Sequence, residues 1–283
     1  MKLVSFLLPI GLLFMEINIF AQSALNGLVV SSENYVGLPY ATIGVKGKER
    51  GTITDNSGNF SLFISDQNLH DSLVFSYVGF ENRTIAVADM MKEKELIISM
   101  KPMAFELSTV EVKGKQNWKY QKIGVTRFFG SWFGYAENNM DQLLFEYAQV
   151  MDAGAEKVQL QSLNFYVPDE EDRGFTFRVF FYNLENGKPG SRFIEKDILL
   201  NQTVQKGWNE LDVSEHNIWI NGAFAVGLQF YKVEKYAGRF FTFLGGNMAA
   251  KKVGSFYRRS HLDIWNEEKS GPYAIYISTR YLR

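Results

Sequence analysis

The chain has 283 residues, which predicts one or two domains at roughly 100–200 residues each. Hydrophobic residues make up 46% and charged residues 22%, as in folded globular proteins, and the 15% of aromatic residues favours strands. A formal net charge of −1 argues against a nucleic-acid partner, and the absence of cysteine excludes disulfides, thiolate metal sites, a cysteine nucleophile and a lipid-carrying cysteine.

The N-terminal residues have the pattern of a secretory signal peptide. Lys2 supplies a positive charge, and residues 3–14 form an apolar run too short to span a bilayer. Small residues place cleavage near Ala21–Gln22, although an uncleaved anchor or a buried helix is the alternative. We therefore expect residues 1–21 to be a signal peptide and the mature chain to have no transmembrane segment. The protein would then be exported to the periplasm, the outer membrane or the cell exterior.

Short apolar runs alternate with turn residues through residues 22–112, which is typical of a small β-sandwich. Residues 55–59 (Asp-Asn-Ser-Gly-Asn) predict a hairpin turn with Gly58 at positive φ, rather than a calcium loop, because the glutamate of such a loop is missing. Residues 88–95 are compatible with a short helix. The expected strands are Leu25–Ser31, Ala41–Val45, Gly51–Thr54, Phe60–Ile64, Leu73–Tyr77, Thr84–Val87, Leu96–Met100 and Thr109–Val112.

Four motifs in this half resemble the carboxypeptidase-regulatory-like domain of envelope proteins of the Bacteroidota. They are Pro39-Tyr40-Ala41-Thr42-Ile43, Gly51-Thr52-Ile53-Thr54-Asp55, Gly58-Asn59-Phe60 and Tyr77-Val78-Gly79-Phe80. The resemblance implies a transthyretin-like, seven-strand β-sandwich. Such domains occur at the N-termini of TonB-dependent receptors and beside other extracytoplasmic modules. After Val112 the chain departs from the receptor pattern, since no plug domain is recognisable, and the remainder resembles uncharacterised sandwich domains.

Residues 113–124 are polar and basic, so we predict a linker between two separately folding domains. Residues 125–283 contain many strand-like runs and no strong helical periodicity, which predicts a larger, jelly-roll-like β-sandwich. Turns are expected at the acidic run Asp169–Asp172 and at Asn186–Gly190. The expected strands are Leu143–Met151, Val158–Val167, Phe175–Tyr182, Ile194–Leu200, Trp208–Val213, Phe224–Tyr231, Arg239–Leu244, Ser255–Arg258 and Tyr273–Arg280.

Common catalytic constellations are not recognisable in the sequence. None of the three histidines, His70, His216 and His261, has a glutamate or histidine three or four residues further on, which argues against a zinc peptidase. A Gly-x-Ser-x-Gly motif and a glycine-rich phosphate loop are also missing. A pair of carboxylates that the fold brings together stays an open alternative. We expect no catalytic residue, no metal and no cofactor.

Alternating residues in the second half separate a core face from a candidate ligand-binding face. Phe175, Phe177, Val179 and Phe181 alternate onto one face of a strand, as do Phe224, Val226, Leu228 and Phe230, and both sets are expected in the core. The predicted ligand-binding face consists of Tyr166, Arg178, Tyr182, Gln229, Tyr231, Tyr276 and Arg280. The alternative is that loops or the first domain cover this face. Trp132, Trp208, Trp219 and Trp265 are interpreted as core or sheet-edge anchors.

These observations favour a non-enzymatic, extracytoplasmic binding or interaction protein. Aromatic rings stack on apolar ligand surfaces while amides and guanidinium groups bind hydroxyls or carboxylates, so the expected ligand is a glycan or a peptide. An envelope protein is the other expected kind of partner. Two alternatives stay open: a hydrolase or hydrolase accessory acting on a polysaccharide or peptide, and a structural subunit of an envelope complex.

Overall fold

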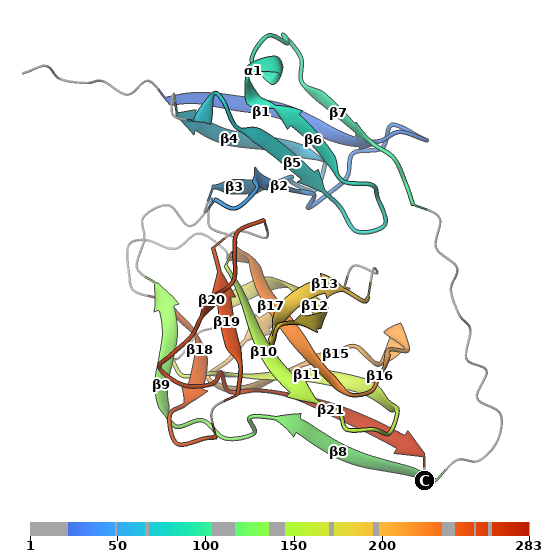
Figure 1. Ribbon diagram of the computed structural model, residues 1–283, viewed down its shortest axis with the longest axis vertical. Helices are drawn as coiled ribbons and strands as arrows, with labels where there is room; N and C mark the ends of the chain where they lie inside the picture. Colours follow the sequence, from blue (N-terminus) through green and yellow to red (C-terminus); the bar gives the residue numbers. More distant parts are fainter. Residues whose placement is uncertain are drawn as a thin grey trace, which may run out of the picture.

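The computed structural model describes residues 22–48, 50–65, 68–103, 117–135, 145–169, 173–194, 198–233, 241–251, 253–259 and 262–282. Figure 1 shows two β-sandwiches stacked end to end, an N-terminal one above a larger C-terminal one. The predicted all-β fold is confirmed. Within these ranges, no helix has the length and apolar character needed to cross a membrane. The predicted signal peptide, residues 1–21, lies outside the described residues.

The N-terminal sandwich has the predicted seven strands in two sheets, with orders β4-β1-β7 and β3-β2-β5-β6. Helix α1 (Val87–Met90) connects the last strand of one sheet to the last strand of the other, near the predicted short helix. Buried apolar side chains such as Val29, Ile43 and Phe75 fill the space between the sheets. The strands are β1 (Gln22–Ser31), β2 (Thr42–Val45), β3 (Gly51–Ile53), β4 (Asn59–Ser65), β5 (Ser72–Ser76), β6 (Arg83–Ala86) and β7 (Ile97–Met100). The predicted strand Thr109–Val112 lies outside the described residues.

The turn at residues 55–59 is present, but the predicted hairpin is wrong. Asp55 Oδ1 accepts the backbone N–H of Ser57 at 2.8 Å and that of Asn59 at 2.9 Å. The flanking strands belong to different sheets, because β3 pairs with β2 and β4 pairs with β1. Local turn chemistry identifies the turn, whereas strand partners are set by packing elsewhere in the chain. The described residues hold no group of three or more potential metal-ligating side chains.

Gly58 has the predicted positive φ, at 89°, and Gly79 has a φ of 82°. At Gly58 the fold also requires the absence of a side chain. A Cβ atom there would lie 2.6 Å from the Val29 carbonyl oxygen and 2.9 Å from Gly37 Cα. Glycine at this position therefore lets the turn pack directly against the backbone of β1.

The C-terminal sandwich contains two sheets built from eight long strands. They are β8 (Trp118–Gly124), β10 (Glu146–Asp152), β11 (Val158–Val167), β12 (Arg173–Glu185), β14 (Ile198–Val204), β15 (Gly207–Asp212), β17 (Ala223–Val233) and β21 (Ile275–Leu282). One sheet has the order β8-β21-β11-β15, and the other contains the order β10-β17-β12-β14. The first and last strands, β8 and β21, are neighbours. This order is that of two interlocked Greek keys, so the predicted jelly roll is confirmed.

Six further strands complete the C-terminal half. They are β9 (Gly130–Tyr135), β13 (Lys188–Arg192), β16 (Trp219–Ile220), β18 (Phe241–Asn247), β19 (Ser255–Arg258) and β20 (Asn266–Glu267). β9 and β18 form a separate two-stranded sheet, and β19 joins β10 to β20. β13 and β16 extend β12 and β11. Of these strands, only β18 and β19 were expected from the sequence.

Two expectations about the connections in this half are corrected. Within the predicted linker 113–124, residues 118–124 are strand β8, which pairs with β21 along its whole length. Its polar side chains are compatible with an edge strand, which has a neighbour on one side only. The predicted turn Asn186–Gly190 is confined to Asn186 and Gly187, with φ values of 52° and 78°, and β13 begins at Lys188. Two central residues with positive φ form the tight hairpin that connects β12 to β13.

The core of the C-terminal sandwich lies between the two long sheets and follows the predicted alternation. Phe177, Val179 and Phe181 on β12 pack against the core, together with the corresponding residues of β17, Phe224, Val226 and Leu228. Facing them from the other sheet are residues of β11 and β21 such as Phe165 and Ile277. Each such side chain contributes on the order of 1.5–3 kcal/mol by leaving water. The core therefore fixes which residues of each strand point outward.

Candidate functional site

The structure divides the predicted ligand-binding residues between two opposite surfaces. Arg178, Tyr182 and Gln229 lie on β12 and β17, whereas Tyr166, Tyr276 and Arg280 lie on β11 and β21 of the other sheet. Each group points away from the shared core, so the single predicted face is wrong. Tyr231 lies on β17, but its side chain is outside the described residues. We call the outer surface of the β10-β17-β12-β14 sheet the covered face, and that of the β8-β21-β11-β15 sheet the open face.

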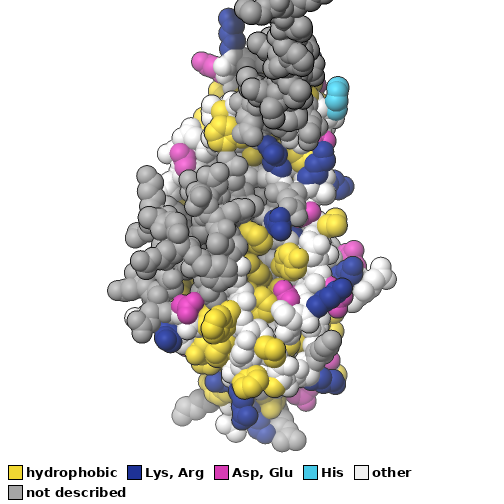
Figure 2. Space-filling view, turned by 90° about the vertical axis from the view of Figure 1, so that its left-hand side faces the viewer, with side chains coloured by type: hydrophobic (Ala, Val, Ile, Leu, Met, Phe, Trp, Pro, Cys, Tyr) yellow, Lys and Arg dark blue, Asp and Glu magenta, His cyan; other side chains and the backbone are white. Residues whose placement is uncertain are grey.

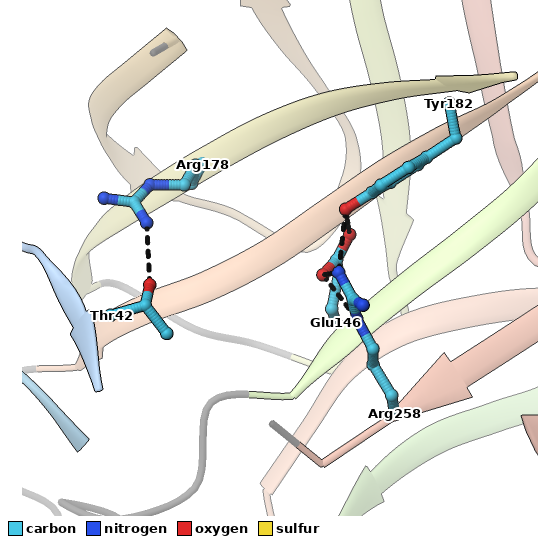
Figure 3. Close-up of polar contacts among 5 residues, drawn as sticks. All are labelled: Thr42, Glu146, Arg178, Tyr182 and Arg258. Carbon is cyan, nitrogen blue, oxygen red and sulfur yellow. Dashed lines mark hydrogen bonds and ion pairs between the residues drawn. The ribbon is translucent and has the colours of Figure 1, made fainter. Parts of the chain in front are cut away.

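On the covered face, Arg178 is 2% exposed and contacts the N-terminal sandwich. Its Nη2 donates to the Tyr40 carbonyl oxygen at 2.7 Å. Its Nη1 donates to Thr42 Oγ1 at 3.3 Å, the contact drawn in Figure 3. A second contact joins the sandwiches where the Gly47 N–H donates to the Leu262 carbonyl at 2.8 Å. The sequence analysis left open that the first domain packs on this face, and for Arg178 this is what the structure shows.

Deeper in the covered face, Glu146, Tyr182 and Arg258 form a buried network (Figure 3). Arg258 donates from Nε to Glu146 Oε2 at 2.9 Å and forms a 2.5 Å ion pair with it through Nη2. The Tyr182 hydroxyl donates to Glu146 Oε1 at 2.5 Å. Gly227 makes room for the carboxylate, since a Cβ atom there would lie 2.5 Å from Glu146 Oε1. The Trp265 ring packs against the network, with its centroid 4.2 Å from the Arg258 guanidinium carbon.

Burial sets the charge states in this network. Loss of water raises the pKa of the Tyr182 phenol well above its usual range, so the hydroxyl stays protonated and remains a donor. Burial opposes the charge on Arg258, but the Glu146 carboxylate outweighs it and raises the pKa of the guanidinium. Glu146 is fully buried and bonded to both partners, and Gln229 beside it is also fully buried. These buried side chains are therefore closed to a ligand.

The open face lies at the far end of the molecule from the N-terminal sandwich, where β8 and β21 are drawn in Figure 1. Strand register defines which side chains share it. Rows that run across the strands are Trp208 and Tyr166; Glu210, Asn164 and Tyr276; Asp212, Ser162, Ser278 and Lys122; and Trp219, Gln159, Arg280 and Tyr120. The last position, beyond Arg280, holds Trp118 opposite Leu282. Aromatic residues thus occupy both ends, with small polar residues between them.

One end of the open face is a cluster of stacked rings. Phe128 stacks on Tyr166 with ring centroids 4.3 Å apart and an interplanar angle of 6°. Trp208 meets Tyr166 edge-on at 5.5 Å and Tyr276 edge-on at 4.8 Å. Because these contacts hold Trp208 while leaving 38% of it exposed, its ring forms a rigid apolar surface in contact with water.

β9 and β18 extend this aromatic cluster. Trp132 pairs with Gly245, which places both on the same side of the two strands, and Trp132 is 65% exposed. A Cβ atom on Gly245 would meet Phe128 at 2.7 Å and Tyr166 at 2.9 Å, so the glycine backbone lies directly against those rings. Trp132 is therefore next to the cluster. Figure 2 views the molecule from the side where β9 lies and shows hydrophobic side chains exposed on the C-terminal sandwich.

The other end of the open face combines Trp118, Trp219 and Arg280. The Arg280 guanidinium lies 4.3 Å from the Trp118 ring centroid, and the two indole rings are 6.2 Å apart. Arg280 Nε donates to Gln159 Oε1 at 2.6 Å. Gln159 in turn donates to Asn217 Oδ1 at 2.7 Å, which also accepts from Trp219 Nε1 at 3.1 Å. This chain of hydrogen bonds fixes the position of the guanidinium.

The centre of the open face is polar. Asn164 donates through Nδ2 to Ser162 Oγ at 2.9 Å and to Ser278 Oγ at 3.3 Å. Glu210 and Asp212 are exposed at one margin, on β15. Hydrogen bonds from Ser214 lower the pKa of Asp212, so its carboxylate is ionised at neutral pH. Ser162 and Asn164 are themselves buried, so the partly exposed Ser278 is the one of these three side chains that suits a hydroxyl group of a ligand.

Sequence reasoning missed several residues of the open face. Trp118, Tyr120 and Lys122 fall in the residues predicted as a linker, so their strand was not considered. Trp208 and Trp132 were interpreted as core or edge anchors, yet both are exposed. Alternating Trp118, Tyr120 and Lys122 is a period-two signal that marks one face of a strand and could have identified β8.

Comparisons with known proteins identify the first domain only. Residues 25–112 match the CarboxypepD_reg-like domain family. No curated protein matches the chain. A solved structure of the cysteine protease and lectin-like domains of Cwp84, a surface layer associated protein of Clostridium difficile, is similar at 12% identity and a TM-score of 0.39. The match covers 85% of this chain and 58% of that one.

A structure of infectious bursal disease virus, Gt strain, aligns with 92% of this chain and 80% of its own at 10% identity and a TM-score of 0.28. The chain thus spans little more than half of the Cwp84 structure, and TM-scores this low establish no functional relationship. The chain contains a CarboxypepD_reg-like domain at residues 25–112, followed by a jelly-roll β-sandwich.

Proposed function

We propose that this is a non-enzymatic binding protein of the cell envelope, exported by its N-terminal signal, and that the open face binds a glycan. The observation that carries the proposal is the exposed Trp208 ring, held by Tyr166 and Tyr276 beside a polar centre. A rigid indole surface stacks on the apolar face of a sugar ring at little cost in side-chain entropy. The Ser278 hydroxyl and the Arg280 guanidinium, both partly exposed on the same sheet, supply partners for the sugar hydroxyls.

The arrangement of the open face supports a glycan over a peptide. A peptide that extends a sheet adds to a strand edge through backbone hydrogen bonds, whereas here the aromatic groups lie on the surface of a sheet. Tyr276 and Arg280 mark the two ends and are four residues apart on β21, which corresponds to ~13 Å along the strand. Such a length accommodates more than one sugar ring, so the expected ligand is an oligosaccharide segment.

One feature favours a hydrolase as the second candidate. Glu210 and Asp212 lie on the same side of β15, two residues or roughly 7 Å apart along the strand, which is within the range for carboxylates that cleave glycosidic bonds. In a glycosidase the two groups flank the bond, whereas these two project in parallel from one strand into water. Binding therefore remains the main proposal. Release of reducing sugar by the wild-type chain, lost in both Glu210→Gln and Asp212→Asn, would establish the hydrolase instead.

The proposal is tested by applying the purified chain to glycan and peptide arrays and measuring affinity for the best ligand by calorimetry. Trp208→Ala should lower glycan affinity at least about tenfold, the effect typical of an aromatic binding residue. Phe63→Ala is the matched control, because Phe63 is an aromatic residue of similar exposure, 42%, in the N-terminal sandwich. Binding of peptides alone, or equal affinities for both variants, would contradict the proposed function.

A further inference from the structure

Arg280 has unused hydrogen-bonding capacity on the open face. Its guanidinium is positioned by the 2.6 Å bond to Gln159 and by stacking on Trp118. An arginine carries five N–H donors, and in the described part of the chain only the Nε donor has an acceptor. No carboxylate of the described residues forms an ion pair with it. The Nη atoms are thus left as a fixed, cationic donor pair on an aromatic surface.

Lys122 is a second basic residue on this side of the open face, and its side chain leans toward Tyr276 whereas that of Arg280 leans toward Trp118. Lys122 pairs with Ser278 and Arg280 pairs with Tyr120, so the two cations are diagonal neighbours on adjacent strands, with Cα atoms roughly 7–8 Å apart or less. Lys122 Nζ donates to the Tyr276 hydroxyl at 3.3 Å and lies 4.7 Å from the Tyr276 ring centroid. Within the described ranges it also has no ion pair with a carboxylate.

The acidic residues of the open face are separated from this pair. Glu210 and Asp212 lie on β15, which is two strands from β21 and therefore roughly 10 Å away. Water screens opposite charges at that separation on an exposed surface. The face consequently has a basic side over β8 and β21 and an acidic side over β15. Two cations without a carboxylate partner on the same side of the face favour an anionic ligand there, because each would then gain a charge-assisted hydrogen bond.

We propose that Arg280 and Lys122 form an anion-binding subsite, and that the ligand of the open face is an acidic polysaccharide carrying carboxylate or sulfate groups. This inference rests on the proposed glycan-binding function and specifies its ligand class. Arg280 takes two oxygens of one anionic group through its paired Nη donors, and Lys122, beside Tyr276, attracts the charge of a further anionic group along the polymer as a point charge. Trp118 and Trp219 contact the sugar ring that carries the anion, while Ser278 lies between the cations and donates to a hydroxyl.

The test uses two matched pairs of probes. Polygalacturonate and its methyl ester share a sugar backbone and differ in the carboxylate, and dextran sulfate and dextran differ in the sulfate. Affinities of the full chain are measured by calorimetry at low and at physiological salt, for wild type, Arg280→Gln and Lys122→Gln. Lys119→Gln is the control, because Lys119 is an exposed lysine on β8 that is one residue out of phase and so points away from the open face.

We expect one of the charged polymers to bind at least tenfold more tightly than its neutral counterpart, which also distinguishes carboxylate from sulfate as the anion. Arg280→Gln should lower that affinity about tenfold or more, Lys122→Gln about three- to fivefold, and Lys119→Gln should leave it unchanged. The salt dependence should weaken in the first two variants. Unchanged melting temperatures, together with unchanged binding of any neutral polymer, show that the variants fold.

The outcomes separate this inference from the proposed function. If the charged and neutral members of each pair bind equally, or if Arg280→Gln binds as wild type does, the anion subsite is overturned while glycan binding stands, provided that Trp208→Ala still lowers the glycan affinity at least about tenfold. If no glycan binds on the arrays or in these pairs, both proposals fail. Binding of acidic peptides in place of acidic glycans would likewise overturn the inference.

Discussion

The two outer faces of the jelly roll carry similar kinds of side chains in opposite states. On the covered face, Glu146, Tyr182 and Arg258 are buried and bonded to one another, and Arg178 contacts the N-terminal sandwich. On the open face, Trp208 is exposed and Arg280 lacks a carboxylate partner among the described residues. Tyrosine, arginine and glutamate therefore indicate a binding surface only where their partners are missing from the protein itself.

The free energy of removing a charged side chain from water explains this difference between the buried and the exposed side chains. A buried ion pair loses its hydration, and its partners must restore all of the lost interactions, so its side chains have no capacity left for a ligand. An exposed cation held in position by stacking and one hydrogen bond keeps its remaining donors in water, where a ligand is able to replace that water. The N-terminal sandwich contacts the covered face, and the open face at the far end of the molecule meets solvent (Figure 1).

The largest expected difference between the faces is in the loss of stability when one carboxylate is removed from each. Glu146→Ala leaves Arg258 buried without its counter-charge and should reduce the free energy of unfolding by about 3–5 kcal/mol. Glu210→Ala is the matched control on the open face, where the side chain is exposed, and should change it by less than ~0.5 kcal/mol. Urea denaturation of both variants measures the two values. Similar losses for the two substitutions would remove the distinction between the faces.

A smaller loss of stability is expected from Gly58→Val in the N-terminal sandwich. The new Cβ atom would clash with the backbone of Val29 at a positive φ, so the first sandwich should lose about 2 kcal/mol or more. Gly47→Val is the control: Gly47 also has a positive φ, 73°, but nothing lies within 4 Å of the added atom. Both variants should bind glycan as wild type does, because the open face is remote from the first sandwich. A loss of glycan affinity in Gly58→Val would show that the two sandwiches act as one site.

Local sequence signals predicted much of the fold. Period-two alternation located the core faces of β12 and β17, and the Asp55 and Gly58 turn was recognisable from its residues. β8 was missed because its polar and basic composition is that of a solvated edge, and alternation on its outer side was overlooked. Short-range patterns therefore predicted strands well where one side is apolar and poorly where both sides meet water.

The candidate site was less predictable, because it depends on long-range strand order. Alternation shows that Arg178 and Tyr276 both point away from a core, but only the order of strands reveals that they leave it in opposite directions. Which outward face is covered depends on contacts such as Arg178 with Tyr40, between residues far apart in the chain. The sequence prediction therefore combined residues of two faces and included Arg280 without its neighbours Trp118 and Lys122.

The five tryptophans allow the most direct measurement of the difference between the faces. Trp118, Trp208 and Trp219 lie on the open face with Trp132 beside it, whereas Trp265 packs on Arg258 at the covered face. Oxidative footprinting by mass spectrometry, with and without the tightest-binding polysaccharide from the arrays, reports the protection of each indole. We predict that the ligand protects Trp208 and Trp118 and leaves oxidation of Trp265 unchanged. Protection of Trp265 with unchanged oxidation of Trp208 and Trp118 would contradict the assignment of ligand binding to the open face.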